Sequence, residues 1–300
     1  MYPSNYDTGF MQGVTIRNIP VEITQSGNSN VFWVSSTVGS NGNQGNFLHP
    51  FSSIAYAISK CSGNGDRIFV TAGHIEQVTS AGGLNLNVPG VVIEFLGEGS
   101  LRGTINFSTV VGVSMTITAA NVTLINPRFT AGIDALTGPI SITSADFTMI
   151  NGEWFDAPAM GTTNCIVATT AATRLGIYGF KYFSSTTGTQ KAACIVMTGV
   201  AFPTLMNINI AGDFSTACIN NATTACTGMI LEKMRCHNIN ATPHPAMVLQ
   251  AGCTGMAKNC DMIVASGVTF ISSVAALNWD AQCLGYHAGG QTGTPLATYS

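Results

Sequence analysis

Charged residues are scarce in this chain. Asp, Glu, Lys and Arg make up 8% of its 300 residues, whereas soluble domains average about 25%. The formal net charge is −3, and no block of Lys or Arg occurs anywhere in the sequence. Because proteins that bind nucleic acid need clustered cations to displace counterions, we expect no nucleic-acid partner.

Long apolar runs are absent as well. Hydrophobic residues reach 46% and the mean hydropathy is +0.30, yet no stretch of about 18 apolar residues exists that would predict a membrane-spanning helix. The first residues, Met1–Asp7, lack the basic and apolar regions of an export signal. We therefore expect no membrane partner, and synthesis in the host cytoplasm.

Cysteine spacing does not follow a disulfide or metal-site pattern. The nine cysteines are odd in number and no CxxC occurs, so buried, free thiols are expected. Cys236-His237 with His244 lacks a second cysteine at ligand spacing. His74 and Glu76 supply too few ligands for a metal, and a solvated turn or an interface is predicted for them. The sequence thus predicts no metal and no cofactor.

From about residue 85 the sequence repeats a short apolar run, an Asn or Gly, and a further apolar residue. The repeat positions are separated by 21 to 31 residues, about the length of one β-helix coil of three strands and three turns. Stacked asparagines at a buried turn can hydrogen-bond to one another from coil to coil. The predicted structural ladder is Asn126, Asn151, Gly179, Asn207, Asn238 and Asn259.

The predicted fold class is all-β: a single-stranded right-handed parallel β-helix with an N-terminal capping helix and an extended N-terminal arm. Apolar residues at helical spacing predict the capping helix within 50–61. A β-sandwich or a meandering barrel is the alternative, but both require hairpin turns that the repeats do not supply. The predicted units are an arm at 1–30, first strand and capping helix at 31–64, coils at 65–268 and a C-terminal cap or tail at 269–300.

The order of a strand, a short amphipathic helix, the strand Gly65-Asp66-Arg67-Ile68-Phe69-Val70 and coils with an Asn ladder resembles the pectate-lyase-like β-helix superfamily. The layout of an arm followed by a β-helix also looks like virion proteins of tailed bacteriophages. That resemblance implies a tailspike, a fibre or a capsid decoration protein, usually a trimer. Members that cleave polysaccharide would need clustered carboxylates, or an acidic cation site with a basic residue.

The sequence does not bring such groups together. Asp146, Glu153 and Asp156 are the densest acidic group in the coils, but they are predicted to lie on different faces of one coil. Lys181 and Arg128 are predicted to have no acidic partner in register. Since polysaccharide hydrolysis needs paired carboxylates, the sequence analysis predicts that the chain is not an enzyme.

The function predicted first is a capsid decoration protein on the outside of a phage head, bound to the major capsid protein as a homotrimer. The alternative is a tailspike or fibre module that binds or cleaves host polysaccharide, and a bacterial enzyme is a third hypothesis. An aromatic row could serve either as a sugar platform or as a hydrophobic trimer seam, and the seam is preferred. The row is Trp154, Phe155, Phe180, Tyr182 and Phe183.

Overall fold

The structure is a computed structural model, and it describes most of the chain. The described residues are 14–16, 19–21, 29–63, 65–156, 159–183, 191–240, 242, 244–272, 276–290 and 292–296.

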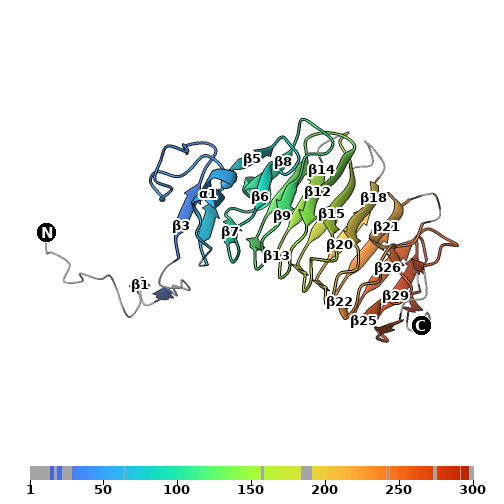
Figure 1. Ribbon diagram of the computed structural model, residues 1–300. Helices are drawn as coiled ribbons and strands as arrows, with labels where there is room; N and C mark the ends of the chain where they lie inside the picture. Colours follow the sequence, from blue (N-terminus) through green and yellow to red (C-terminus); the bar gives the residue numbers. More distant parts are fainter. Residues whose placement is uncertain are drawn as a thin grey trace, which may run out of the picture.

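The chain winds into a right-handed parallel β-helix, as the sequence predicted (Figure 1). Each coil contributes one strand to each of three parallel sheets, and a strand pairs with the equivalent strands of the coils before and after it. A β-sandwich or meandering barrel would pair consecutive strands antiparallel. In the described residues, antiparallel pairing is confined to two short pairs near the chain ends, β1 with β2 and β29 with β30, so these alternatives are excluded.

The first sheet consists of β3 (Val31–Val34), β4 (Arg67–Val70), β7 (Val92–Phe95), β10 (Thr123–Ile125), β13 (Thr148–Ile150), β16 (Gly176–Tyr178), β19 (Thr204–Met206), β22 (Met229–Glu232), β25 (Thr254–Lys258) and β28 (Ala276–Trp279). The second sheet consists of β5 (Ile75–Val78), β8 (Thr104–Phe107), β11 (Arg128–Ala131), β14 (Glu153–Asp156), β17 (Lys181–Phe183), β20 (Asn209–Gly212), β23 (Arg235–Asn238), β26 (Asp261–Val264), β29 (Leu284–His287) and β30 (Thr294–Pro295). The third sheet consists of β6 (Leu84–Leu86), β9 (Met115–Ile117), β12 (Leu136–Ile142), β15 (Thr162–Ala168), β18 (Lys191–Met197), β21 (Phe214–Asn221), β24 (Met247–Leu249) and β27 (Ile271–Ser272). The remaining elements are the hairpin of β1 (Val14–Ile16) and β2 (Ile19–Val21), the helix α1 (Ile54–Lys60) and the 3₁₀ turn η1 (Gly99–Leu101).

Helix α1 lies at the N-terminal end of the coils (Figure 1), which confirms the predicted capping helix. Its buried residues Ile54, Ala57 and Ile58 belong to the core that fills the coils. Ser53 caps the helix by accepting a hydrogen bond from the Tyr56 backbone N–H at 3.3 Å. The helix therefore shields the apolar interior where no further coil is stacked upon it.

The pair His74 and Glu76 supports this helix and does not form the solvated turn that the sequence predicted. Both side chains are buried, and His74 Nε2 lies 3.0 Å from Glu76 Oε2. The Glu76 carboxylate accepts hydrogen bonds from the backbone N–H groups of Ile54, at 2.8 Å, and Ala55, at 3.3 Å. These N–H groups have no partner within the helix, so burying Glu76 satisfies them.

Alternation along the strands decides which aromatic residues reach the surface. Trp154, Phe180 and Tyr182 are at most 1% exposed, whereas Phe155 and Phe183 are 47% and 52% exposed. Successive strand residues point to opposite faces, so Trp154 and Tyr182 point into the coil while their neighbours point out. The predicted row of five is therefore corrected: only Phe155 and Phe183 are available for a surface role.

The inward-pointing aromatic residues stack on one another from coil to coil. The ring centroid of Trp154 lies 6.0 Å from that of Phe129, and the Phe129 ring lies 6.4 Å from that of Phe107. In the next coil Tyr182 contacts Phe214 with centroids 5.6 Å apart. These rings fill the interior behind the second sheet. The sequence analysis had placed Trp154 and Tyr182 in an external trimer seam.

The corner between the first and second sheets carries the predicted repeat. Its residues adopt positive φ, the left-handed conformation that Asn and Gly accept at low cost. The backbone N–H of each corner residue donates to an oxygen of the following coil. The acceptor is a backbone carbonyl at the first five corners and the Asp280 carboxylate at Asn259. These residues are Asn126 (φ 59°), Asn151 (φ 55°), Gly179 (φ 75°), Asn207 (φ 56°), Lys233 (φ 52°) and Asn259 (φ 51°).

Two features of the predicted ladder are corrected by this geometry. Asn151, Asn207 and Asn259 are exposed and not buried, so these corners stack through their backbone N–H groups. At Asn126 the side-chain amide also donates, to the carbonyls of Phe95 and Gly97 in the preceding coil. The second correction concerns Asn238, which lies at the end of β23, where its buried amide hydrogen-bonds to the backbone of Phe214. The corner residue of this coil is Lys233, and with this assignment the corner recurs every 25 to 28 residues along the sequence.

The predicted unit boundaries stay predictions. Most of the arm at 1–30 lies outside the described residues, and its described part contains β1 and β2. The predicted cap or tail at 269–300 contains β27, β28 and β29, which continue the three sheets, followed by β30.

We predict opposite stability effects for two substitutions at this corner. Lys233→Asn should raise the free energy of unfolding by up to about 1 kcal/mol, because Asn accepts positive φ more readily than Lys. Asn207→Val should lower it by about 1–2 kcal/mol, because a β-branched residue is strained there. Both values can be measured by urea unfolding followed by circular dichroism. A destabilised Lys233→Asn variant would contradict the backbone account of the corner.

Candidate functional site

The outer face of the second sheet presents two rows of side chains in strict register. Residues two positions after each corner form the first row, and residues four positions after it form the second. Arg128, Glu153 and Lys181 are direct neighbours on β11, β14 and β17. In the second row, Phe155 lies between Thr130 and Phe183. Charge and aromatic surface are therefore adjacent at the middle of the sheet.

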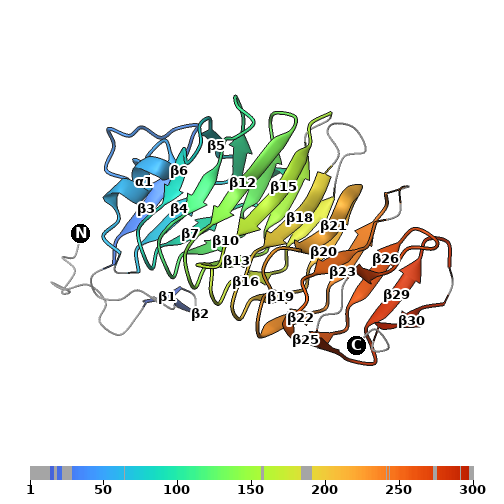
Figure 2. The same ribbon diagram turned by 45° about the vertical axis from the view of Figure 1, so that its right-hand side comes forward.

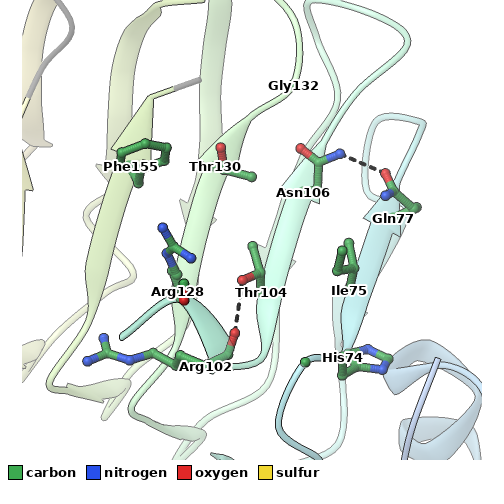
Figure 3. A pocket seen from close by; sticks show the side chains of 12 residues that line it. His74, Ile75, Gln77, Arg102, Thr104, Asn106, Arg128, Thr130, Gly132 and Phe155 are labelled. Carbon is green, nitrogen blue, oxygen red and sulfur yellow. Dashed lines mark hydrogen bonds between the residues drawn. The ribbon is translucent and has the colours of Figure 1, made fainter. Parts of the chain in front are cut away.

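A groove of about 470 Å³ runs over strands β5, β8, β11 and β14. Figure 3 shows Gln77, Asn106, Thr130 and Phe155 along one level of these neighbouring strands, with Arg128 beside them. The Asn106 amide donates to Gln77 Oε1 at 2.8 Å. The groove is thus lined by amides, a hydroxyl, an aromatic ring and cationic groups.

Arg102 and Arg128 bring cationic groups to this groove. The Arg128 guanidinium carbon lies 5.1 Å from the centroid of the Phe155 ring, within the range of a cation–π contact. Arg102 donates to the Asn151 carbonyl at 3.1 Å and lies 3.5 Å from the Glu153 carboxylate. The Nε atoms of both arginines are buried and have no hydrogen-bond partner. An unsatisfied buried donor is costly, so both arginines are held at some cost in a groove where their positive charge can serve an anionic ligand.

A second hollow, of about 340 Å³, lies at the adjoining corner. Arg102, Glu153 and Lys181 line it together with the corner residues Asn126 and Asn151. Arg102, Arg128 and Lys181 give three positive charges against the single carboxylate of Glu153. The centre of this face is therefore net positive in a chain whose net charge is −3.

The sequence analysis did not predict that Arg128, Glu153 and Lys181 lie together, although their spacing from the ladder residues indicates it. Arg128, Glu153 and Lys181 each follow the predicted ladder residues Asn126, Asn151 and Gly179 by two positions. The prediction that Arg128 and Lys181 lack an acidic partner in register is therefore wrong, because Glu153 lies between them. Counting forward from the ladder would have shown this arrangement.

Carboxylates are not paired on this face for hydrolysis. In the described part of the second sheet, Glu153 and Asp261 point outward, whereas Glu76 and Asp156 are buried. Glu153 and Asp261 lie four strands apart, about 19 Å at the strand spacing. Glycoside hydrolases place their two carboxyl groups about 5–9.5 Å apart.

Metal-binding geometry is also absent from the described residues. They contain no group of three or more His, Cys, Asp and Glu side chains placed to hold a metal ion. Cys236 is buried in the core while its neighbour His237 faces outward. No helix in the described ranges meets the length and hydropathy that a membrane-spanning helix requires.

The cysteines occupy the core as free thiols. Eight are buried, and Cys61 is partly exposed. Burial raises the pKa of the Cys165 and Cys194 thiols, which lie within hydrogen-bonding reach of each other. These thiols act as neutral packing groups and are not available as nucleophiles.

A buried ion pair lies directly behind the aromatic surface. Asp156, on β14, is 3.5 Å from Lys191 Nζ on β18, and both side chains are at most 2% exposed. The Asp156 carboxylate also accepts from Trp154 Nε1 at 2.8 Å and from the Tyr182 hydroxyl at 3.3 Å. Burial raises the pKa of the Tyr182 phenol, which keeps it a neutral donor. This network fixes the inner side of the strands that display Phe155 and Phe183.

We predict that Asp156→Asn lowers the free energy of unfolding by about 3–5 kcal/mol, because it leaves a buried ammonium without its counter-charge. Asp146→Asn is the matched control, since Asp146 pairs with Arg174 at the surface and surface ion pairs contribute little. Urea unfolding of the two variants measures the difference. Equal losses would contradict the structural role of the buried pair.

Neither models of known protein families nor sequences of curated proteins match this chain. Two solved proteins are similar in structure. A GH136 lacto-N-biosidase from Eubacterium ramulus, as its selenomethionine derivative, has a TM-score of 0.46 at 11% identity, over 86% of this chain and 68% of that chain. A rhamnogalacturonan lyase has a TM-score of 0.43 at 9% identity, over 89% of each chain. At this level of similarity the fold assignment rests on the three parallel sheets described above.

The prediction that the chain is not an enzyme is corrected. One of its two premises, that Lys181 and Arg128 lack an acidic partner in register, fails because Glu153 lies between them. Both similar structures, moreover, are those of enzymes. The predicted phage setting, with the major capsid protein and a homotrimer as partners and the virion surface as location, stays a prediction.

Proposed function

We propose that the chain binds an acidic polysaccharide along the outer face of the second sheet. The observation that carries this proposal is the placement of Arg102 and Arg128 along one groove beside the exposed ring of Phe155. Uronate carboxylates match guanidinium groups in charge and planar shape.

The rest of the groove suits a sugar. A sugar ring presents apolar C–H faces that pack against aromatic rings, and Phe155 and Phe183 offer adjacent exposed rings. Sugar hydroxyls need both donors and acceptors, which the amides of Gln77 and Asn106 and the hydroxyl of Thr130 supply. Beyond β14 the second sheet continues over β17 and the following strands, so a polymer can extend from the groove along this face.

This function bears on the two predicted virion roles. A tailspike or fibre module uses a sugar-binding face, whereas a capsid decoration protein has no need of one. Within the predicted phage setting we therefore propose the tailspike or fibre role ahead of the capsid decoration role. The polysaccharide function itself does not depend on that setting.

We predict that Arg128→Ala and Phe155→Ala each weaken binding of a galacturonate hexasaccharide about tenfold or more. Hydrogen bonds to charged groups contribute about 1.5–3 kcal/mol, which corresponds to this loss or a larger one. Isothermal titration calorimetry at two salt concentrations measures the affinity, which should fall as salt rises.

Two matched variants serve as controls for this experiment. Phe202→Ala removes a 63% exposed ring at a corner away from the second sheet, and Arg174→Ala removes the surface partner of Asp146. Both should bind the oligosaccharide as the unchanged protein does. Equal losses in test and control variants, or no binding by the unchanged protein, would exclude the proposed site.

Cleavage of the bound chain is a second candidate function, favoured by the placement of Lys181 beside Glu153 and near the arginines. In a β-elimination, a base removes the proton α to the uronate carboxylate, and the bond to the β-oxygen of the adjoining sugar breaks. The electron pair forms a carbon–carbon double bond, and a proton is delivered to the departing oxygen. Arginines neutralise the carboxylate during this step. Lys181 in its unprotonated amine form is the base that accepts the proton, and the resulting ammonium or a solvent water delivers a proton to the departing oxygen.

We predict that incubation with polygalacturonate yields unsaturated oligosaccharides, detected by their ultraviolet absorbance. Lys181→Arg should remove this product while the hexasaccharide affinity changes less than threefold, because the guanidinium stays protonated, and so cannot accept the proton, but remains able to bind an anion. Binding without any unsaturated product from the unchanged protein would limit the function to recognition.

A further inference from the structure

A second groove lies toward the C-terminal end of the same sheet face. It has a volume of about 430 Å³ and is formed over β23, β26 and β29, which lie side by side in Figure 2. Arg235, His237, Asp261, Tyr286 and His287 line it. None of these residues takes part in the acidic site proposed above.

The register places this groove in line with the first. His237, on β23, is followed in the same row by Ile263 and Tyr286 on the next two strands. Phe155 lies in that row three strands earlier, about 14 Å away at the strand spacing. The two grooves are therefore separate sites on one continuous face.

Charge is balanced in this groove, unlike in the first. Arg235 and Asp261 are direct neighbours in register, so one positive and one negative group lie side by side. Burial, with a further contribution from the charge of Arg235, lowers the pKa of His237. His237 is thus a neutral imidazole near pH 7, with one donor and one acceptor nitrogen.

The second histidine has a defined orientation. His287 Nδ1 lies 3.1 Å from the Ala265 carbonyl oxygen. Because a carbonyl oxygen can only accept, Nδ1 carries a proton and donates it to Ala265, which leaves Nε2 free to face the groove. The His287 ring also packs against Phe270, with centroids 4.8 Å apart. The groove thus combines fixed acceptors and donors with the ring of Tyr286.

The geometry points to a second sugar-binding site in this groove, one that takes an uncharged, hydroxyl-rich sugar unit. Sugar hydroxyls act as donors and acceptors at once, and this groove offers both: Arg235 only donates, Asp261 only accepts, and neutral His237 and Tyr286 do both. A carboxylate on the sugar would be repelled by Asp261 as much as it is attracted by Arg235. The apolar face of the sugar packs on Tyr286.

Histidine side-chain NMR tests this site directly. The probes are the methyl glycosides of glucose, galactose, mannose and rhamnose, with the methyl glycoside of galacturonic acid for comparison. The signals of His237 and His287 should shift in a saturable way with at least one neutral glycoside, and at least threefold more weakly with the acidic one. With the neutral glycosides, the signals of His49, His74 and His244 should stay in place.

Variants separate this site from the acidic site. Tyr286→Ala should abolish the saturable shifts, whereas Tyr178→Ala, which removes a partly exposed tyrosine from the first sheet, should leave them intact. Phe155→Ala should also leave them intact, so failure of the acidic site does not affect this result. Absence of shifts with every neutral glycoside, or shifts that survive in Tyr286→Ala, would overturn the inference.

Discussion

The backbone corner between the first and second sheets is the constraint on which the rest of the structure depends. Each corner residue adopts positive φ and donates its backbone N–H to an oxygen of the next coil, which is a backbone carbonyl at every corner except Asn259, where it is the Asp280 carboxylate. This bond fixes the height of each coil relative to its neighbour. It also fixes the point at which each strand of the second sheet starts, and therefore which side chain faces which across coils.

Rows of side chains follow from this constraint. Residues two positions after the corner form one row, and this is why Arg128, Glu153 and Lys181 meet although 25 and 28 residues separate them in sequence. Residues four positions after it bring Phe155 next to Phe183. The site is therefore a property of the stacking period, and a shift of one residue in any coil would turn that coil's members inward.

The coil fold could be predicted because its signal is periodic and local. Asn126, Asn151 and Asn207 are residues that favour the left-handed conformation, so the sequence marks their corners. Lys233 carries no such mark, since lysine has no preference for positive φ. The repeat was therefore assigned to Asn238, whose buried amide serves a different turn.

The surface was harder to predict than the fold. A row of aromatic residues looks the same in sequence whether it faces inward or outward, and only the phase of each strand separates Trp154 from Phe155. Buried charges mislead in the same way, because Asp156 is acidic in sequence but neutralised by Lys191 inside the coil. The network that joins strands β14 and β18 depends on coil stacking, which no local pattern reveals.

The distribution of charge among the three sheets gives the scarcity of charge a functional meaning. Within the strands of the third sheet, the one charged residue is Lys191, and it is buried. The outer face of the second sheet, in contrast, carries Arg128, Glu153, Lys181, Arg235 and Asp261.

Equivalent positions of adjacent coils lie next to each other and recur every 25 to 28 residues in the sequence. Like charges at such positions would repel each other. In the two clusters, opposite charges alternate along the row, so this repulsion is avoided. Under the proposed function, these clusters are the recognition surface, and an anionic polymer that approaches the molecule is drawn to the net positive centre of the second sheet.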